Sequence, residues 1–61
     1  MNKKYYLTWW LGEELIETEY DEKKFKNSKK AIEFGNKHWA DVERGIVGNT
    51  EDLKFQVEVD E

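Results

Sequence analysis

The stretch YYLTWWL at residues 5–11 decides how this chain folds, because it places four of the nine aromatic residues in seven consecutive positions. A β-strand turns alternate side chains to opposite faces, so such a run fills both faces of one strand. One half of the run can form the core of a small protein. The other half, Tyr6 and Trp10, has no evident place in that core. We interpret this surplus as an indication of binding rather than of catalysis.

The length of 61 residues predicts one small domain, residues 1–61, near the lower size limit for folding without disulfides or a structural metal. The chain has no cysteine, which excludes disulfides and cysteine-based zinc sites. The three Trp, three Tyr and three Phe residues are therefore expected to supply most of the buried area.

The chain carries no targeting or membrane-spanning pattern. Its first residues lack the apolar run of a secretory signal, and no window is apolar enough for a membrane span. Together with the absence of cysteine, this predicts a cytoplasmic protein without a membrane partner. The composition is rich in Lys, Asn, Glu and Ile and lacks proline, which is typical of short reading frames in AT-rich bacterial or phage genomes.

The net charge of −4 is unevenly distributed along the chain. An acidic block at residues 13–22 is followed by a basic block at residues 23–30, and residues 51–61 are acidic again. An acidic balance with a single arginine argues against a protein that binds duplex DNA, because such binding depends on neutralising phosphates. Most of these charges are expected on solvated faces.

The first two expected elements form a β-hairpin around Gly12-Glu13, with glycine at the position where a type II′ turn needs a positive φ. This register places Trp9 opposite Ile16, whereas a three-residue turn would place it opposite Glu17. We favour the first register because it separates apolar from charged side chains. It predicts a core face with Tyr5, Leu7, Trp9, Leu11, Ile16, Thr18 and Tyr20, and an opposite face with Tyr6, Thr8, Trp10, Leu15, Glu17 and Glu19.

Residues 28–44 predict a helix, with Asn27 or Ser28 as its N-cap and Gly45 as a left-handed stop. Gly35 lies at the centre of the apolar stripe, where glycine costs about 1 kcal/mol relative to alanine. We explain it by a close approach of the helix to a bulky sheet residue such as Trp9. The stripe consists of Ala31, Ile32, Gly35, His38, Trp39 and Val42, with Phe34 at its edge.

Residues 53–59 alternate without a fault, with apolar residues at 53, 55, 57 and 59, and predict a third strand. The loop before it, residues 45–50, is expected to tuck Ile46 and Val47 inward. The fold class is therefore α+β, with the order ββαβ. We expect a three-stranded, antiparallel-centred mixed sheet in the order 2-1-3, with one helix packed on one face.

Catalytic groups are sparse in this sequence, and we expect no enzyme, cofactor or metal site. Ser28 and His38 lie roughly 15 Å apart along the helix, too far for a nucleophile and its base. His38 and Asp41 are helical neighbours, but two ligands do not make a zinc site. Glu17 and Glu19 have a spacing that resembles paired catalytic carboxylates, but they are expected on an open face without a cleft.

The uncovered sheet face predicts a small non-enzymatic protein-interaction module that binds a protein partner or forms a homodimer. Two carboxylates at its rim would suit a basic partner, as in small acidic inhibitors from mobile elements. The predicted partner-binding residues are Tyr6, Thr8, Trp10, Leu15, Glu17 and Glu19.

Two alternatives remain open. Single-stranded nucleic acid could stack on Tyr6 and Trp10. Few lysines lie near that face, and acidic side chains oppose them, so we expect nucleic acid less than protein. Alternatively, the first residues, residues 21–27 or the acidic tail fold over the apolar strip and cover it.

Overall fold

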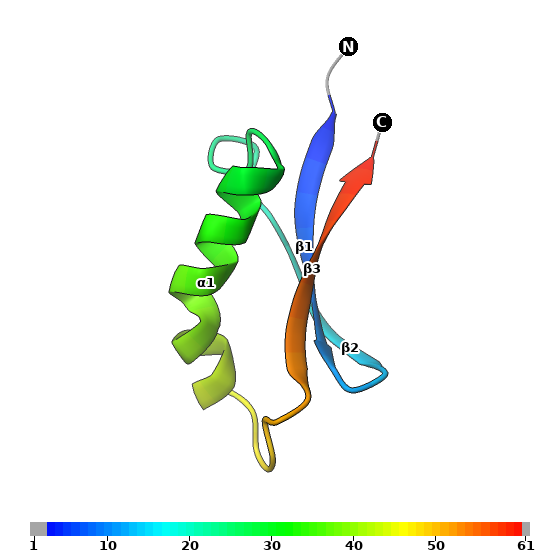
Figure 1. Ribbon diagram of the computed structural model, residues 1–61, viewed down its shortest axis with the longest axis vertical. Coiled ribbons are helices and arrows are strands. Elements are labelled where there is room, and N and C mark those ends of the chain that lie inside the picture. The colour runs from blue at the N-terminus through cyan, green and yellow to red at the C-terminus, as the bar shows by residue number, and fades with distance from the viewer. Residues whose placement is uncertain (1–2, 61) are drawn as a thin grey trace.

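The computed structural model describes residues 3–60 and contains three strands and one helix. The elements are β1 (Lys4–Leu11), β2 (Glu14–Tyr20), α1 (Ser28–Arg44) and β3 (Leu53–Asp60). The sheet has the order β2-β1-β3, and α1 packs on one of its faces (Figure 1). The predicted α+β class, the ββαβ order and the position of β1 at the centre are confirmed. Both neighbouring strand pairs are antiparallel, and the outer strands share a direction without pairing.

Residues 3–60 form two layers, and none of these residues covers the sheet face opposite the helix. Its Cα atoms span 41 × 21 × 14 Å, and the shortest extent leaves room for one sheet and one helix. The backbone of α1 contacts β1 and β3 but not β2. The strand β2 is therefore an edge strand that meets α1 through side chains only, as between Glu19 and His38. Within residues 3–60, no helix is long and apolar enough to cross a membrane.

The hairpin turn has the predicted length. Leu11 pairs with Glu14, so Gly12 and Glu13 form a two-residue turn. Gly12 has a φ of 65°, and no described residue other than glycine has a positive φ, as a type II′ turn requires. The Gly12 N–H donates to the Asp52 carbonyl at 3.1 Å, which ties the turn to the start of β3.

The predicted register beyond the turn is wrong, because β2 contains a β-bulge at Ile16. The pair Trp10–Leu15 follows the two-residue turn, but Trp9 then pairs with Glu17 rather than with Ile16. One extra residue in β2 shifts every later pair by one and exchanges the faces of the side chains. Glu17 and Glu19 therefore lie on the side of α1, while Thr18 and Tyr20 lie on the opposite side.

The helix begins as predicted and ends differently. The Asn27 side chain is the N-cap and accepts a hydrogen bond from the Lys30 N–H at 2.9 Å. Gly45 follows the last turn with φ −80° and ψ −7°, so the predicted left-handed stop is wrong. Ile32, expected on the buried stripe, is 44% exposed, whereas Phe34, expected at its edge, packs against the core.

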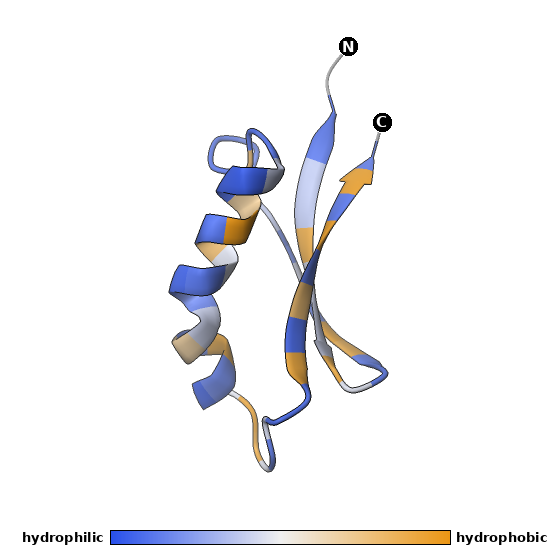
Figure 2. Ribbon diagram, in the orientation of Figure 1, coloured by the Kyte–Doolittle hydropathy of each residue, from blue (hydrophilic) through white to orange (hydrophobic). Residues whose placement is uncertain are grey.

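The core lies between α1 and the adjacent sheet face. Leu7 and Trp9 are completely buried, and the Trp9 ring lies 5.0 Å from Phe55 and 5.8 Å from Trp39. Apolar and polar residues alternate along β3, as Figure 2 shows. The apolar residues of this strand complete the sheet side of the core. The buried hydrophobic residues of this core are Leu7, Trp9, Phe25, Ala31 and Leu53.

Gly35 allows the helix to approach the sheet, as predicted, but the residue it meets is Phe55. A Cβ at Gly35 would lie 2.7 Å from two atoms of the Phe55 ring, closer than real Cβ contacts. The ring of Phe55 therefore occupies the space that a side chain at position 35 would need. The expectation that Trp9 is this neighbour is wrong, because Trp9 packs beside Phe55 instead.

The two connections also pack on the side of α1. Phe25 is 4% exposed, and its ring lies 5.1 Å from Phe34. Asp21 starts this connection by accepting N–H bonds from Lys23 and Lys24, and these bonds lower the pKa of its carboxyl group. In the second connection Ile46 packs against the core, but Val47 is fully exposed. The prediction that both residues point inward is thus confirmed for Ile46 and wrong for Val47.

Candidate functional site

The strand register defines a surface of nine residues on the side of the sheet opposite α1. Directly paired residues of antiparallel strands point to the same side. We call this surface the open face, and it has three cross-strand rows. These rows are Tyr20–Tyr6–Glu58, Thr18–Thr8–Gln56 and Leu15–Trp10–Lys54.

The side chains of the open face are partly accessible. Leu15 is 48% exposed and Tyr20 is 49% exposed, while Tyr6 and Trp10 are half-buried. Isolated apolar residues on a surface are ordinary, but these four form two cross-strand pairs, Tyr6–Tyr20 and Trp10–Leu15, on either side of the Thr8–Thr18 pair. The open face therefore carries two partly exposed apolar pairs that flank a polar row.

A hydrogen bond holds the Trp10 indole over the centre of the open face. Its Nε1–H donates to Thr8 Oγ1 at 3.1 Å. Thr8 is only 7% exposed although no helix lies above it, which is consistent with an indole lying across it. Because the polar atom of the indole already has a partner, Trp10 presents mainly apolar ring surface to any ligand.

No described segment covers the open face. Residues 21–27 bury Phe25 in the core on the other side of the sheet, and the chain up to Asp60 is part of β3. Within residues 3–60, the alternative that these segments fold over the aromatic strip is thus wrong. Residues 1, 2 and 61 lie outside the described residues.

The charges of the open face differ from the predicted ones. The bulge in β2 moves Glu17 and Glu19 to the side of α1, so the acidic rim is absent from this surface. The remaining charges are Lys54 and Glu58, with the Lys4–Asp60 pair of positions beyond the row of Tyr6. The open face therefore has balanced charge. Tyr20, which was expected on the core face, joins it, and Lys4 Nζ lies 5.8 Å from its ring centroid.

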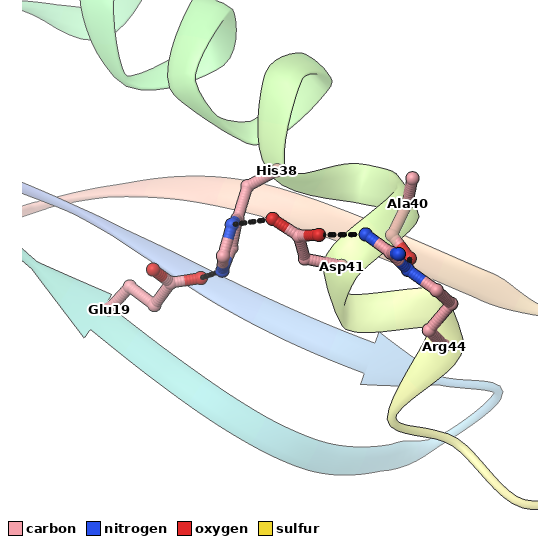
Figure 3. Close-up of polar contacts among 5 residues, drawn as sticks. All are labelled: Glu19, His38, Ala40, Asp41 and Arg44. Atoms are coloured by element: carbon pink, nitrogen blue, oxygen red, sulfur yellow. Dashed lines mark hydrogen bonds and ion pairs between the residues drawn. The ribbon is translucent and has the colours of Figure 1, made fainter.

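Glu19, one of the two displaced carboxylates, forms a second cluster with side chains of the helix (Figure 3). His38 Nε2 lies 3.5 Å from Glu19 Oε1, and His38 Nδ1 lies 3.4 Å from Asp41 Oδ2. Asp41 also forms an ion pair with Arg44. This chain of contacts links the edge strand β2 to the last turns of α1.

The environment of Glu19 disfavours its charge. Burial raises the pKa of the Glu19 carboxyl group, and the neighbouring Glu17 raises it further, while His38 acts in the opposite direction. Like His38, the Trp9 indole N–H lowers the pKa of Glu19. This N–H is nevertheless buried without a hydrogen bond of normal geometry. Glu19 is thus an acidic group held at the edge of an aromatic core.

Glu17, Glu19 and His38 are also the described residues best placed to hold a metal ion. Each offers one ligand atom, and these atoms lie within 4.8 Å of one another. Asp41 would orient the imidazole from behind, as carboxylates do in zinc sites. However, Glu17 is exposed and His38 already has carboxylate partners on both nitrogens. These contacts account for the cluster as a network of polar side chains at the edge of the core.

Ser28, the other candidate group from the sequence, is not brought to this cluster. It opens α1, whereas His38 lies in the second half of the helix and pairs with Glu19. The structure therefore does not place the hydroxyl beside the imidazole.

Sequence reasoning missed the bulge, and His38 was the available signal. In the predicted register, an imidazole on the buried stripe would have faced a mainly apolar sheet surface without a carboxylate. A histidine in that position calls for a polar partner on the facing strand, and the bulge supplies Glu19. No protein-family model, curated protein or solved structure matches this chain, so its function has to be argued from this geometry.

Proposed function

We propose that this protein is a small non-enzymatic interaction module that binds protein through its open face. The observation that carries the proposal is the unequal cover of the sheet. One face is buried under α1, whereas Leu15, Tyr20, Trp10 and Tyr6 lie together on the other with no described segment above them. Tyrosine and tryptophan supply much of the binding energy in protein interfaces.

The balanced charge of the open face bears on the kind of partner. The acidic character of the chain was a reason to expect a basic partner. With Glu17 and Glu19 on the side of α1, that reason no longer applies to this surface. A partner that offers a flat apolar area with charges of both signs is the better match.

A photo-crosslinking amino acid at position 15 tests the proposal even though the partner is unidentified. Leu15 is exposed within the open face, and Lys37 on the outer surface of α1 is a matched control position. In cells that express the chain, position 15 should form adducts with protein that position 37 does not form. Equal adducts from both positions, or none from position 15, would contradict the proposal.

A second candidate function is the stacking of single-stranded nucleic acid on the open face. It gains support from the displacement of Glu17 and Glu19 and from the addition of Tyr20 to the exposed rings. Against it, Lys54 and Glu58 alternate along β3 rather than forming a positive track. Titration with oligonucleotides at low salt should leave tryptophan fluorescence unchanged, and saturable quenching lost in Trp10→Phe would favour this function instead.

A further inference from the structure

We infer that the occupant of the open face is a second copy of this chain, related by a two-fold axis that crosses the strands over Thr8. This inference rests on the proposed function and specifies its partner. It follows from the order of the three cross-strand rows, in which Thr18–Thr8–Gln56 is the central row. An axis along this polar row exchanges the two outer rows between the copies.

This two-fold rotation places apolar side chains of one copy opposite apolar side chains of the other. Under this rotation each strand lies over its own copy in the antiparallel direction. Tyr6 then faces Trp10 of the second copy, and Tyr20 faces Leu15. Each contact occurs twice, as in any two-fold interface. Face-to-face packing of twisted sheets accommodates such an arrangement at about 10 Å separation.

The same exchange brings opposite charges together. Lys54 and Glu58 lie on β3 at equal distances from Gln56, one on each side. The axis therefore places Lys54 over Glu58 of the second copy, and Glu58 over Lys54. Within residues 3–60 neither side chain has an ion-pair partner of its own. Both charges are thus available to a second copy.

The other two-fold arrangement of these faces is less favourable. An axis along β1 would lay β2 of one copy over β3 of the other. Lys54 would then face Leu15, and Glu58 would face Tyr20, so each charge would be desolvated against an apolar side chain. The charges of β3 therefore select the axis that crosses the strands.

The size of the open face sets the strength of this dimer. Three strands about 4.8 Å apart and seven residues of β1 give a flat area of roughly 14 by 20 Å per copy. This lies below the contact area of a standard interface, about 800 Å² per partner. The dimer should accordingly dissociate with a constant on the order of 10 µM rather than in the nanomolar range.

Charge reversal tests the pairing directly, with sedimentation equilibrium at roughly 5–500 µM, a range that spans the expected dissociation constant. Lys54→Glu and Glu58→Lys should each weaken the dimer about tenfold, because either change creates two repulsive pairs. The double variant should restore the wild-type constant to within about threefold. Lys37→Glu on the outer surface of α1 is the matched control and should change nothing.

The outcomes separate this inference from the proposed function. A wild-type protein that stays monomeric at about 500 µM overturns the inference, and position-15 crosslinks to other proteins would still support the proposed function. A dimer without rescue in the double variant also overturns the two-fold pairing. Trp10→Ala then locates the dimer interface: dissociation keeps the open face as the interface, whereas an unchanged dimer removes the open face from the dimer and leaves the proposed function to be tested by the position-15 crosslinks.

Discussion

The two faces of β1 differ in what they contribute, and the adjacent residues Trp9 and Trp10 show the difference most clearly. Trp9 is completely buried and contacts the rings of Phe55 and Trp39. Trp10 is half-buried, and its only described polar contact is Thr8 on its own strand. The same residue type one position apart thus belongs to the fold on one face and, in our proposal, to recognition on the other.

The largest expected effect is on the buried face. Trp9→Ala should cost about 3–5 kcal/mol, because a large aromatic residue leaves a cavity that its neighbours cannot fill. A domain of this size has a total stability of only about 3–5 kcal/mol, so the variant should be largely unfolded at room temperature. Far-UV circular dichroism measures this. A cooperative transition near the wild-type midpoint would contradict the assigned role of Trp9.

Gly35→Ala tests the closest contact between α1 and the buried face. The new Cβ overlaps the Phe55 ring, so we expect a loss of about 1–3 kcal/mol despite the better helix propensity of alanine. Gly45→Ala, whose Cβ would meet only ordinary contacts, is the control and should be close to neutral. In a Phe55→Leu background the cost of Gly35→Ala should disappear. An equal cost in both backgrounds would refute the contact.

Glu19→Gln tests the edge of the buried face, where the Glu19 carboxyl group contacts His38. The pKa of Glu19 is raised in the folded state, so the folded protein holds this proton more tightly than the unfolded chain. The contribution of Glu19 to wild-type stability should therefore fall as the pH rises through that pKa. The Gln variant lacks this loss and should melt above wild type at about pH 8, with a smaller difference at about pH 4.

Exposed Glu17 provides the control for this titration, since Glu17→Gln should change the melting temperature less. If Glu19→Gln instead lowered the melting temperature at high pH, the contact of the Glu19 carboxylate with the His38 imidazole would outweigh the burial of the carboxylate. In that case the edge strand would depend on the pair for its position.

The smallest expected effect is on the stability of the open face. Leu15→Gln removes an exposed apolar side chain and should change the free energy of unfolding by no more than about 0.5 kcal/mol. Urea denaturation checks this value. A loss comparable to that of Gly35→Ala would mean that the open face contributes to the fold, and the contrast between the faces would fail.

Local patterns were sufficient to predict most of the architecture. The alternation of residues 53–59, the glycine at the turn and the Asn27 cap each act over a few positions, so the sequence reveals them directly. The strand order followed because only residues 5–11 are apolar on both faces. Each of these features depends on interactions that a short window contains.

The bulge could not be predicted from such local patterns, because Leu15 and Ile16 are both apolar and fit either register. The choice depends on contacts between distant residues, with Glu19 reaching His38 and Ile16 packing on the core. The error in the register also made the predicted set of partner-binding residues partly wrong. Tyr6, Thr8, Trp10 and Leu15 remain together on the open face, whereas the two carboxylates do not.

The contrast between the faces is tested most directly by measuring two quantities on Trp10→Ala. One is the yield of protein adducts from a photo-crosslinker at position 15, and the other is the thermal midpoint of the same sample. We predict that the yield falls about tenfold, as for a central aromatic anchor, while the protein stays folded with a loss of only about 1 kcal/mol. An unchanged yield, or unfolding like that of Trp9→Ala, would contradict the division of β1 into a folding face and a binding face.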